Sequence, residues 1–409
     1  MTASTQSHPL RADPGRWWIP LVLLICVILS FLDKVSVGIL VSSPVFRAEM
    51  GLSGEDSIRF GLLMTSFLLS YSLASILISG LADRFSPVYC LYGLLVLMAG
   101  ALLLLSGSES YREFLRYRIV LGVIEGPLFA LAYAIVRRSF PPLQQARATM
   151  LWLLGTPIGA AVGFPLLNWV LTVWGWRTAY WVIAALVIPV LLATWWVLRH
   201  WSQRYGGVRP RQSWQAGASD RHRLFVRPAF WAVCVFNMAF MGYLWGLNSW
   251  LPTYLSVDRG VKLEQLGLIS AFPFIGMLIG EIAGAWLSDR LDRRALVCSA
   301  ALGSAALGLL GVLLAPGNGL AIAAMVFSAC AWGAAAPSIF PLLAKVTPGQ
   351  FAATAGGLCN GLGNVSGALV PLGMGALVAL TGTLAAGLAL MMTLALLGAL
   401  MLLPLVRRA

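Results

Sequence analysis

The chain has 409 residues, of which 59% are hydrophobic and only 11% are charged, and its mean hydropathy is +0.84. Soluble globular domains carry about 25% charged residues, so the composition excludes a soluble protein and predicts an integral membrane protein. The formal net charge of +13 does not indicate a nucleic-acid partner, because the basic residues gather in loops on one side of the predicted spans.

Twelve apolar runs are long enough to cross a bilayer, which takes roughly 20 residues each. A polar stretch, RHWSQRYGGVRPRQSWQAGASDRHRLF, separates the first six runs from the last six. The first run lacks a small-residue cleavage site after it, so we interpret it as a span and not as a signal peptide. The predicted helices cover residues 17–42, 60–82, 88–107, 111–136, 147–171, 177–198, 229–254, 265–288, 295–314, 320–345, 353–380 and 384–406.

We therefore expect an all-α membrane protein of twelve transmembrane helices in two pseudo-symmetric six-helix bundles. The expected segments are an N-terminal tail (1–16), a first bundle (17–199), a basic linker (200–227), a second bundle (228–406) and a short C-terminus (407–409). Nineteen lysines and arginines fall in the loops on one side and six on the other. This bias places both termini and the linker in the cytoplasm.

The two halves show internal similarity at one shared offset. The motif GLADRF at 80–85 recurs as WLSDRL at 286–291, so that Asp83 and Asp289 are separated by 206 residues, as are Pro165 and Pro371. This offset predicts a duplication in parallel orientation. Duplicated transporters bind substrate between their repeats, near the middle of the bilayer. The motif residues Asp83, Arg84, Asp289 and Arg290 are predicted latches that pair across the bundles and separate as the bundles rock.

Four charges lie deep in the predicted spans: Asp33 and Lys34 in ILSFLDKVSVGIL, and Arg118 and Glu125 in the fourth run. Each charge at mid-bilayer costs roughly 2.5–3.5 kcal/mol or more. Arg118 and Glu125 are seven residues apart and share one helix face. A balanced salt-bridge network is one interpretation. However, stability alone is a weak reason to keep four buried charges.

The second interpretation is that the four charges bind an anion and a proton. With both acids ionised the set is neutral, and an incoming carboxylate makes it −1. Protonation of Asp33 or Glu125 restores the balance, so substrate and proton favour each other's binding. Arg116, nearer the outer end, is expected to snorkel to the interface. Glu281 is a further buried charge, for which a structural network and a proton site are both open.

Polar side chains also gather in the second half, on the seventh, tenth and eleventh predicted helices. Glycine-mediated helix packing accounts for much of GGLCNGLGNVSGALVPLG. For the asparagines, both packing and substrate contact remain open. The candidate substrate-binding residues in this half are Tyr243, Asn248, Ser338, Asn360 and Asn364.

The sequence shows no catalytic or metal-binding motif. The three histidines, His8, His200 and His222, lie outside the predicted spans, and there is no HExxH, GxSxG or GxxxxGK[ST] motif. The six cysteines fall in apolar runs without a CxxC pair and are expected to pack rather than form disulfides or bind metal. We therefore expect that the protein is not an enzyme and that it binds no metal and no cofactor.

Several motifs resemble the major facilitator superfamily and, more narrowly, its anion:cation symporter family. They are FLDKVSVG, GLADRF, RIVLGVIEGPLFA, WGWRTAYWV, WLPTYL and GGLCNGLGNVSGALVP. The resemblance implies that Asp33 and Glu125 are proton-coupling acids and that Lys34 and Arg118 contact a carboxylate. It also implies pocket positions for Tyr71, Asn360 and Asn364.

The sequence departs from that family's pattern at Lys34, Ser75 and Ala130, where arginine, glutamine and proline are usual, and PPLQQAR lacks the usual glutamate before Arg147. These departures favour a smaller or more apolar acid than a typical sugar acid. The expected function is secondary active transport of a small organic anion with protons, by alternating access, by a monomer in the bacterial inner membrane. The alternative is an exporter or antiporter of a drug-like, siderophore-like or amino-acid substrate.

Overall fold

The computed structural model describes residues 14–52, 57–204, 225–260 and 263–406. Every regular element among these residues is a helix. Most of the predicted N-terminal tail, most of the predicted basic linker and the C-terminal residues 407–409 lie outside the described residues. We call residues 14–204 the first half and residues 225–406 the second half.

The first half begins with a short 3-10 turn and contains the long helices expected from the apolar runs. Its last helix continues to Arg204, five residues beyond the predicted end of the first bundle at 199. Its elements are η1 (Pro14–Trp17), α1 (Trp18–Ser42), α2 (Pro44–Glu49), α3 (Ser57–Ile78), α4 (Leu81–Arg84), α5 (Pro87–Ser106), α6 (Tyr111–Glu125), α7 (Leu128–Ser139), η2 (Pro142–Gln144), α8 (Gln145–Leu153), α9 (Gly155–Trp174) and α10 (Trp176–Arg204).

The long helices of the second half have 18 to 30 residues. Its elements are α12 (Pro228–Thr253), the π-helical turn η4 (Tyr254–Asp258), α13 (Leu263–Leu291), α14 (Arg294–Leu314), α15 (Asn318–Val346), η5 (Gly349–Phe351), α16 (Ala352–Thr381), α17 (Leu384–Met401) and α18 (Leu403–Val406).

The fourth predicted helix, residues 111–136, is divided in the structure. Helix α6 ends at Glu125, and α7 begins at Leu128. Pro127 lies in the break and has no backbone N–H, so it cannot donate the hydrogen bond that would continue α6. Glu125, one of the four deep charges, is consequently the last residue of its helix.

Eleven helical segments among the described residues are long and apolar enough to cross a membrane. They begin with Gly15–Val37 and end with Leu384–Val406, and their best windows have mean hydropathies of 1.5 to 2.4. Helix α13, with 29 residues, is not one of the eleven. The protein is therefore an all-helical, multi-pass membrane protein.

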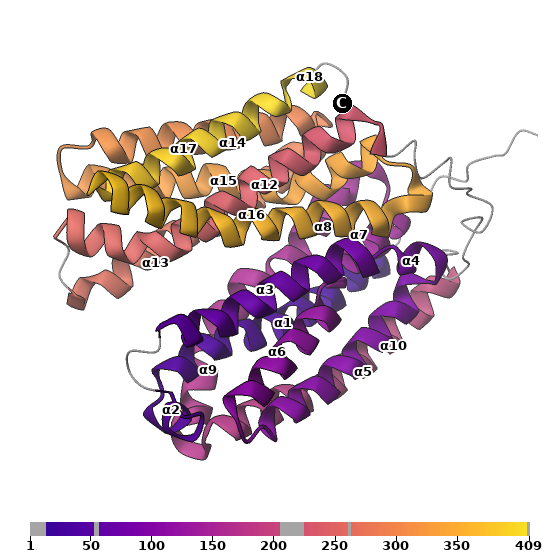
Figure 1. Ribbon diagram of the computed structural model, residues 1–409. Helices are drawn as coiled ribbons and strands as arrows, with labels where there is room; N and C mark the ends of the chain where they lie inside the picture. The colour runs from indigo at the N-terminus through magenta and orange to yellow at the C-terminus, as the bar shows by residue number, and fades with distance from the viewer. Residues whose placement is uncertain (1–13, 53–56, 205–224, 261–262, 407–409) are drawn as a thin grey trace, which may run out of the picture.

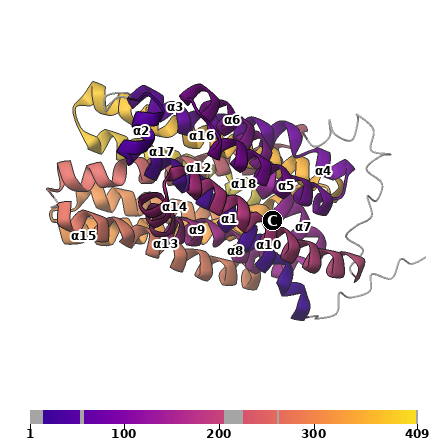
Figure 2. The same ribbon diagram turned by 90° about the horizontal axis from the view of Figure 1, so that it is seen from below.

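The helices of the two halves form two groups that lie closest to each other at one end of the molecule (Figure 1). We call this the linker end, because α10 ends there at Arg204 and α12 begins there at Pro228. The view turned by 90° shows the helices of both groups running along the same general direction (Figure 2).

Contacts between the halves run through α16, which packs against α3, α4 and α7, and through α13 and α15, which pack against α8. Helices α3 and α16 approach closely because Gly357 and Gly361 have no side chain. A Cβ at either glycine would overlap backbone and side-chain atoms of α3 or of Ser79, which directly follows it. Small residues permit such close packing of membrane helices.

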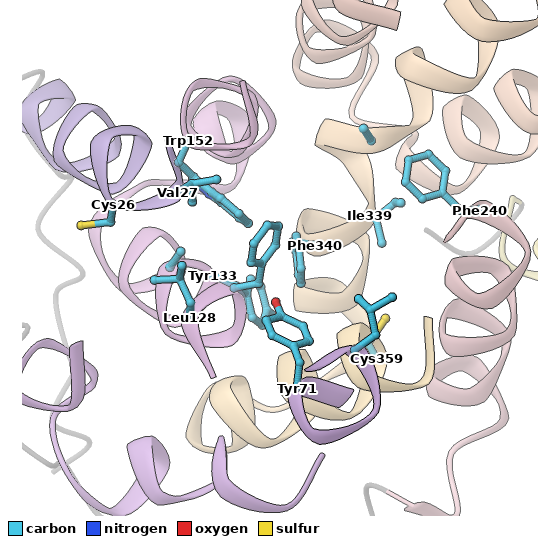
Figure 3. Packing of buried hydrophobic residues seen from close by; sticks show 14 of the residues in the cluster. Cys26, Val27, Tyr71, Leu128, Tyr133, Trp152, Phe240, Ile339, Phe340 and Cys359 are labelled. Carbon is cyan, nitrogen blue, oxygen red and sulfur yellow. The ribbon is translucent and has the colours of Figure 1, made fainter. Parts of the chain in front are cut away.

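Aromatic rings fill the contact between the halves beside α7, α8 and α15. Tyr133 stacks on Phe340 with ring centroids 5.2 Å apart, and Trp152 lies 5.6 Å from the same ring (Figure 3). All six cysteines lie among the described residues and are free, as expected from their apolar positions.

Candidate functional site

The four deep charges meet at the contact between α1 and α6. Asp33 and Lys34 are consecutive on α1, so their side chains leave the helix about 100° apart, as the 3.6-residue turn dictates. Arg118 and Glu125 lie two turns apart on one face of α6. Each residue of α1 therefore meets a different residue of α6, and the four charges form two ion pairs.

The first pair joins Arg118 and Asp33. Arg118 Nη1 donates to both carboxylate oxygens of Asp33, at 2.9 and 2.7 Å, and both side chains are completely buried. The guanidinium lies over the ring of Phe67, 4.3 Å from its centroid. Arg118 Nε and Nη2 have no hydrogen-bond acceptor among the described residues, so the buried guanidinium keeps donors that a further anion or water could use.

The second pair joins Lys34 and Glu125, with Nζ 2.7 Å from Oε2. Ser30, one turn before Lys34, lies between them. Its hydroxyl donates to Glu125 Oε2 and accepts from Lys34 Nζ, at 2.5 Å in each case. Glu125 is completely buried, whereas 11% of the Lys34 side chain is exposed. Glu125 Oε1 has no hydrogen-bond donor among the described residues.

Aromatic rings surround the ammonium group of Lys34. Its Nζ lies 5.2 Å from the ring centroid of Phe31, 5.4 Å from that of Phe67 and 5.2 Å from that of Tyr71. Cations within about 6 Å of an aromatic face are attracted to it. The rings therefore stabilise the charge of Lys34 without using its hydrogen-bond donors, which bind the oxygens of Ser30 and Glu125.

Tyr71 connects the charges to the second half. Asn360 Nδ2 lies 3.3 Å from the Tyr71 hydroxyl and 3.3 Å from Ser75 Oγ, and Ser75 Oγ donates to the Gly357 carbonyl at 3.0 Å. Asn364 Nδ2 donates to the Asn360 carbonyl at 2.9 Å. The predicted pocket residues Tyr71, Asn360 and Asn364 thus form one hydrogen-bonded chain across the contact between α3 and α16 (Tyr71 is labelled in Figure 3).

Three other predicted substrate-binding residues lie apart from this chain. Tyr243 is fully buried and shares a 2.7 Å hydrogen bond with Ser328 of α15. Asn248 is exposed on α12 and donates to the Leu244 carbonyl of its own helix. Ser338 is fully buried on α15, and its hydroxyl has no hydrogen-bond partner among the described residues.

The two predicted latch aspartates both bind a helix start in the other half. Asp83 accepts from the backbone N–H groups of Ala353 and Thr354 at 2.8 and 2.7 Å, at the start of α16. Asp289 accepts from Ala146 and Arg147 at 3.1 and 3.0 Å, at the start of α8. The first N–H groups of a helix have no partner within the helix and carry partial positive charge, so a carboxylate stabilises them.

The two latch arginines are arranged differently. Arg84 is exposed at the end of α4, and Arg290 lies over the ring of Trp286 on its own helix at 5.0 Å. The cation that pairs with a latch carboxylate is Arg147, whose Nε lies 2.9 Å from Asp289 Oδ2.

Sequence reasoning missed several residues that complete these contacts. Ser30 had a signal, since it stands four residues before Lys34 and so shares its helix face. Arg137 donates to the carbonyls of Ala344 and Thr347 at the end of α15. A basic residue near free C-terminal carbonyls is a common arrangement, but the sequence alone does not show that α7 and α15 meet.

The chemistry available to this site is the binding of anions and protons. No group of three or more metal-ligating side chains lies among the described residues. A single partly exposed ammonium, held by a buried carboxylate that has one free oxygen, can exchange that carboxylate for an external anion. The carboxylate it releases is then an acceptor for a proton.

Buried ionisable side chains inside a helical membrane protein are typical of transporters. The sequence profile of the Major Facilitator Superfamily matches residues 23–371 and 245–409, and the chain belongs to this superfamily. The curated relatives and solved structures below are transporters, and the protein is a transporter and not an enzyme.

Two relatives cover nearly the whole chain. A probable sulfoacetate transporter of Cupriavidus necator is 28% identical over 387 residues, covering 88% of this chain and 87% of the relative. The hexuronate transporter of Bacillus subtilis is 26% identical over 402 residues, covering 92% of each. Among solved structures, the superfamily transporter FucP in its outward conformation matches with a TM-score of 0.74 at 18% identity, over 94% of this chain and 98% of FucP.

Proposed function

We propose that this protein is a secondary active transporter that moves a small organic anion together with protons by alternating access. The observation that carries the proposal is the pair of Lys34 and Glu125, in which a partly exposed cation is held by a completely buried acid. A structural ion pair does not require one partner to reach solvent. A binding site for an anion does.

The proposed coupling is a competition for Lys34. A substrate anion that binds Nζ displaces Glu125 from it, which leaves a buried carboxylate without its cation. An unpaired buried charge is costly, so Glu125 takes up a proton and the site returns to its former net charge. Because linkage is reciprocal, the proton strengthens anion binding to the same degree that the anion strengthens proton binding.

Arg118 and Asp33 form the second layer of the proposed site. Arg118 keeps two donor nitrogens free and supplies positive potential behind Lys34, and Asp33 is the second acid able to take a proton. We assign substrate contact to Lys34, Arg118, Tyr71, Asn360 and Asn364. Tyr243 and Asn248 form hydrogen bonds within the second half, to Ser328 and Leu244, and we assign no substrate contact to them or to Ser338.

Alternating access requires that the contact between the halves can break. We propose two six-helix bundles, with α13 as the twelfth span, that rock about the site. In the arrangement described here the linker end is closed by Asp83, which binds the start of α16, and by Asp289, which binds the start of α8. Opening this end breaks both contacts and closes the opposite end.

We infer an orientation with both termini and the linker in the cytoplasm of a bacterial inner membrane, and a monomeric protein. Nineteen lysines and arginines in the loops of one side, against six on the other, support this orientation because cytoplasmic loops retain positive charge. The two halves already supply both sides of the proposed site, so no second copy is needed.

The proposed substrate class is a small carboxylate or sulfonate. Two relatives are named for sulfoacetate and hexuronate, both of which carry an anionic group that a lysine can bind. Ser75 and the aromatic rings of Phe31 and Phe67 leave less polar surface beside Lys34 than a fully hydroxylated sugar acid would use. This composition favours a short acid.

The test is uptake into proteoliposomes by the purified protein, with an imposed pH gradient. The panel contains sulfoacetate, short monocarboxylates, hexuronates and hexarates, with neutral sugars and a cationic drug as controls. We expect accumulation of one acid that collapses when the proton gradient is abolished. Glu125→Gln should abolish the dependence on the gradient, while Glu113→Gln, at the start of the same helix, should keep it.

Two results would contradict the proposal. One is accumulation of the acid that is unchanged without a proton gradient. The other is transport or thermal stabilisation by neutral or cationic compounds alone, which would favour an exporter or antiporter of a drug-like substrate. Ligands that bind the folded state raise its melting temperature, so a thermal-shift screen of the same panel checks the binding step independently.

A further inference from the structure

Glu281 of α13 is a buried acid that the proposed site does not use. Its side chain is 5% exposed, and Oε2 has no hydrogen-bond partner among the described residues. It lies about 27 Å along the helix from the start of α13 and about 15 Å from its end, at 1.5 Å per residue. A carboxyl group at this depth lies far from both ends of the helix.

Glu281 belongs to the face of α13 that is buried within the protein. Met277 and Ala285, one turn before and one turn after it, are 5% and 0% exposed. On the other face, Ile279 is 57% exposed and Ile282 is 50% exposed. Helix α13 packs against α15 of the same half and α8 of the other half.

The internal duplication places Glu281 at the boundary between the halves. Glu281 stands eight residues before Asp289, and Ser75 stands eight residues before Asp83. Ser75 forms hydrogen bonds across the boundary, to Gly357 and Asn360 of α16. Glu281 occupies the corresponding position on α13, which faces α8 in the same way that α3 faces α16.

The charged groups on the packed helices all lie far from Glu281 along the helix direction. On α13 itself they are Asp289 and Arg290, which begin two turns away toward the linker end, or about 12 Å, and Glu264, about 26 Å away near the start of the helix. The groups contributed by the neighbouring helices are Arg147 of α8 and Lys345 of α15, and Asp289 already binds Arg147. No cation of these helices therefore compensates a negative charge on Glu281.

We propose that Glu281 is a second proton-binding site, occupied by a proton while α13 is packed against α8 and emptied when the two helices separate at the linker end. In the packed arrangement an ionised Glu281 would be a buried charge without a partner, which is strongly unfavourable. Opening of the linker end admits water to the α13–α8 contact, and the hydrated carboxyl group then releases its proton toward that side.

This inference rests on the proposed alternating access, and it assigns at least one transported proton to the second half. It differs from the competition at Lys34 because no substrate atom needs to touch Glu281. Proton binding at Glu281 depends on whether α13 and α8 are packed together, whereas proton binding at Glu125 depends on whether the anion is bound.

Infrared difference spectroscopy of the purified full-length protein in lipid nanodiscs tests the inference directly, because a protonated carboxyl group absorbs apart from a carboxylate. Across a pH series we expect the wild type to keep a protonated-carboxyl band at neutral pH, and Glu281→Gln to lose it. Glu109→Gln, an exposed acid near the start of α6, should leave the band unchanged. Asp289→Asn, which weakens the α13–α8 contact, should move the loss of the band to lower pH, and Arg290→Gln should not.

Each outcome has one meaning. Coincident spectra for wild type and Glu281→Gln would overturn the inference, and an unmoved band in Asp289→Asn would overturn its link to the α13–α8 contact. In proteoliposomes we expect Glu281→Gln to carry one proton fewer per anion; an unchanged ratio also counts against it. If the protein transports no anion at all, the proposed function fails while the infrared result still decides the state of Glu281.

Discussion

Lys34 Nζ lies 2.7 Å from Glu125 Oε2, and Lys34 is the one member of the four deep charges with an exposed fraction above zero, at 11%. The ion pair therefore has one partner that an incoming anion can reach and one that it cannot. This asymmetry makes the pair a candidate coupling device, and it also makes the two residues unequal in mutagenesis.

Lys34→Ala should destabilise the folded protein by about 3–5 kcal/mol, because it leaves the carboxylate of Glu125 buried without its cation. Glu125→Gln in the same chain should restore most of that loss, since a neutral amide needs no counter-charge. The measurement is a double-mutant cycle by chemical or thermal unfolding at neutral pH. Additive losses in the double variant would mean that the two side chains do not compensate each other.

Arg118→Ala should destabilise the folded protein by a similar amount, because Asp33 is completely buried and accepts both hydrogen bonds from Arg118 Nη1. Arg116→Ala is the matched control: the same residue type on the same helix, but with an exposed side chain. Surface substitutions of this kind stay within about 0.5 kcal/mol. Equal losses for the two variants would contradict a special role for the buried arginine.

The sequence contained most of the fold but not the pairing of the charges. Apolar runs and a shared offset located the long helices, and the spacing of Arg118 and Glu125 placed both on one face of α6. Which acid meets which base depends on the rotation of α1 against α6, and no local pattern encodes that angle. Pro127 was a usable signal for the break after Glu125, and the prediction of one continuous helix overlooked it.

The latch contacts show a second limit of sequence reasoning. The recurrence of aspartate beside arginine in GLADRF and WLSDRL suggested ion pairs, yet Asp83 binds the backbone N–H groups that begin α16. Unpaired N–H groups at a helix start attract carboxylates whatever the side chains nearby. The partner was therefore a backbone feature of another helix, which a search among charged side chains could not find.

Asp83→Asn should reduce the fraction of molecules closed at the linker end, because an amide is a weaker acceptor and carries no charge for the N–H groups of Ala353 and Thr354 to stabilise. Distances between spin labels on the linker-end loops of the two halves measure that fraction. The comparison is Arg84→Gln, which alters the neighbouring exposed residue of the same motif. If Arg84→Gln opens the linker end and Asp83→Asn does not, the arginine and not the aspartate is the latch.

A pH-dependent contact also joins α2 to α10 at the end opposite the linker. Partial burial raises the pKa of Glu49, but hydrogen bonds from Arg177 and Trp176 and the positive charge of Arg177 outweigh this effect, so its pKa lies below the usual value. Trp176 Nε1 donates to Glu49 Oε2 at 3.0 Å, and Arg177 donates to the same oxygen.

A pKa that is lower in the folded state than in the unfolded state gives stability that is present above the unfolded value, about 4.3 for glutamate, and is lost as the pH falls through the folded value. Glu49→Gln should therefore destabilise the protein modestly at pH 7, by about 0.2–1 kcal/mol for so exposed an ion pair. The difference in melting temperature between wild type and Glu49→Gln should shrink toward zero as the pH falls below about 4. A difference that stays constant through this range would show that the charge of Glu49 contributes nothing, and that the variant acts through the loss of its hydrogen bonds alone.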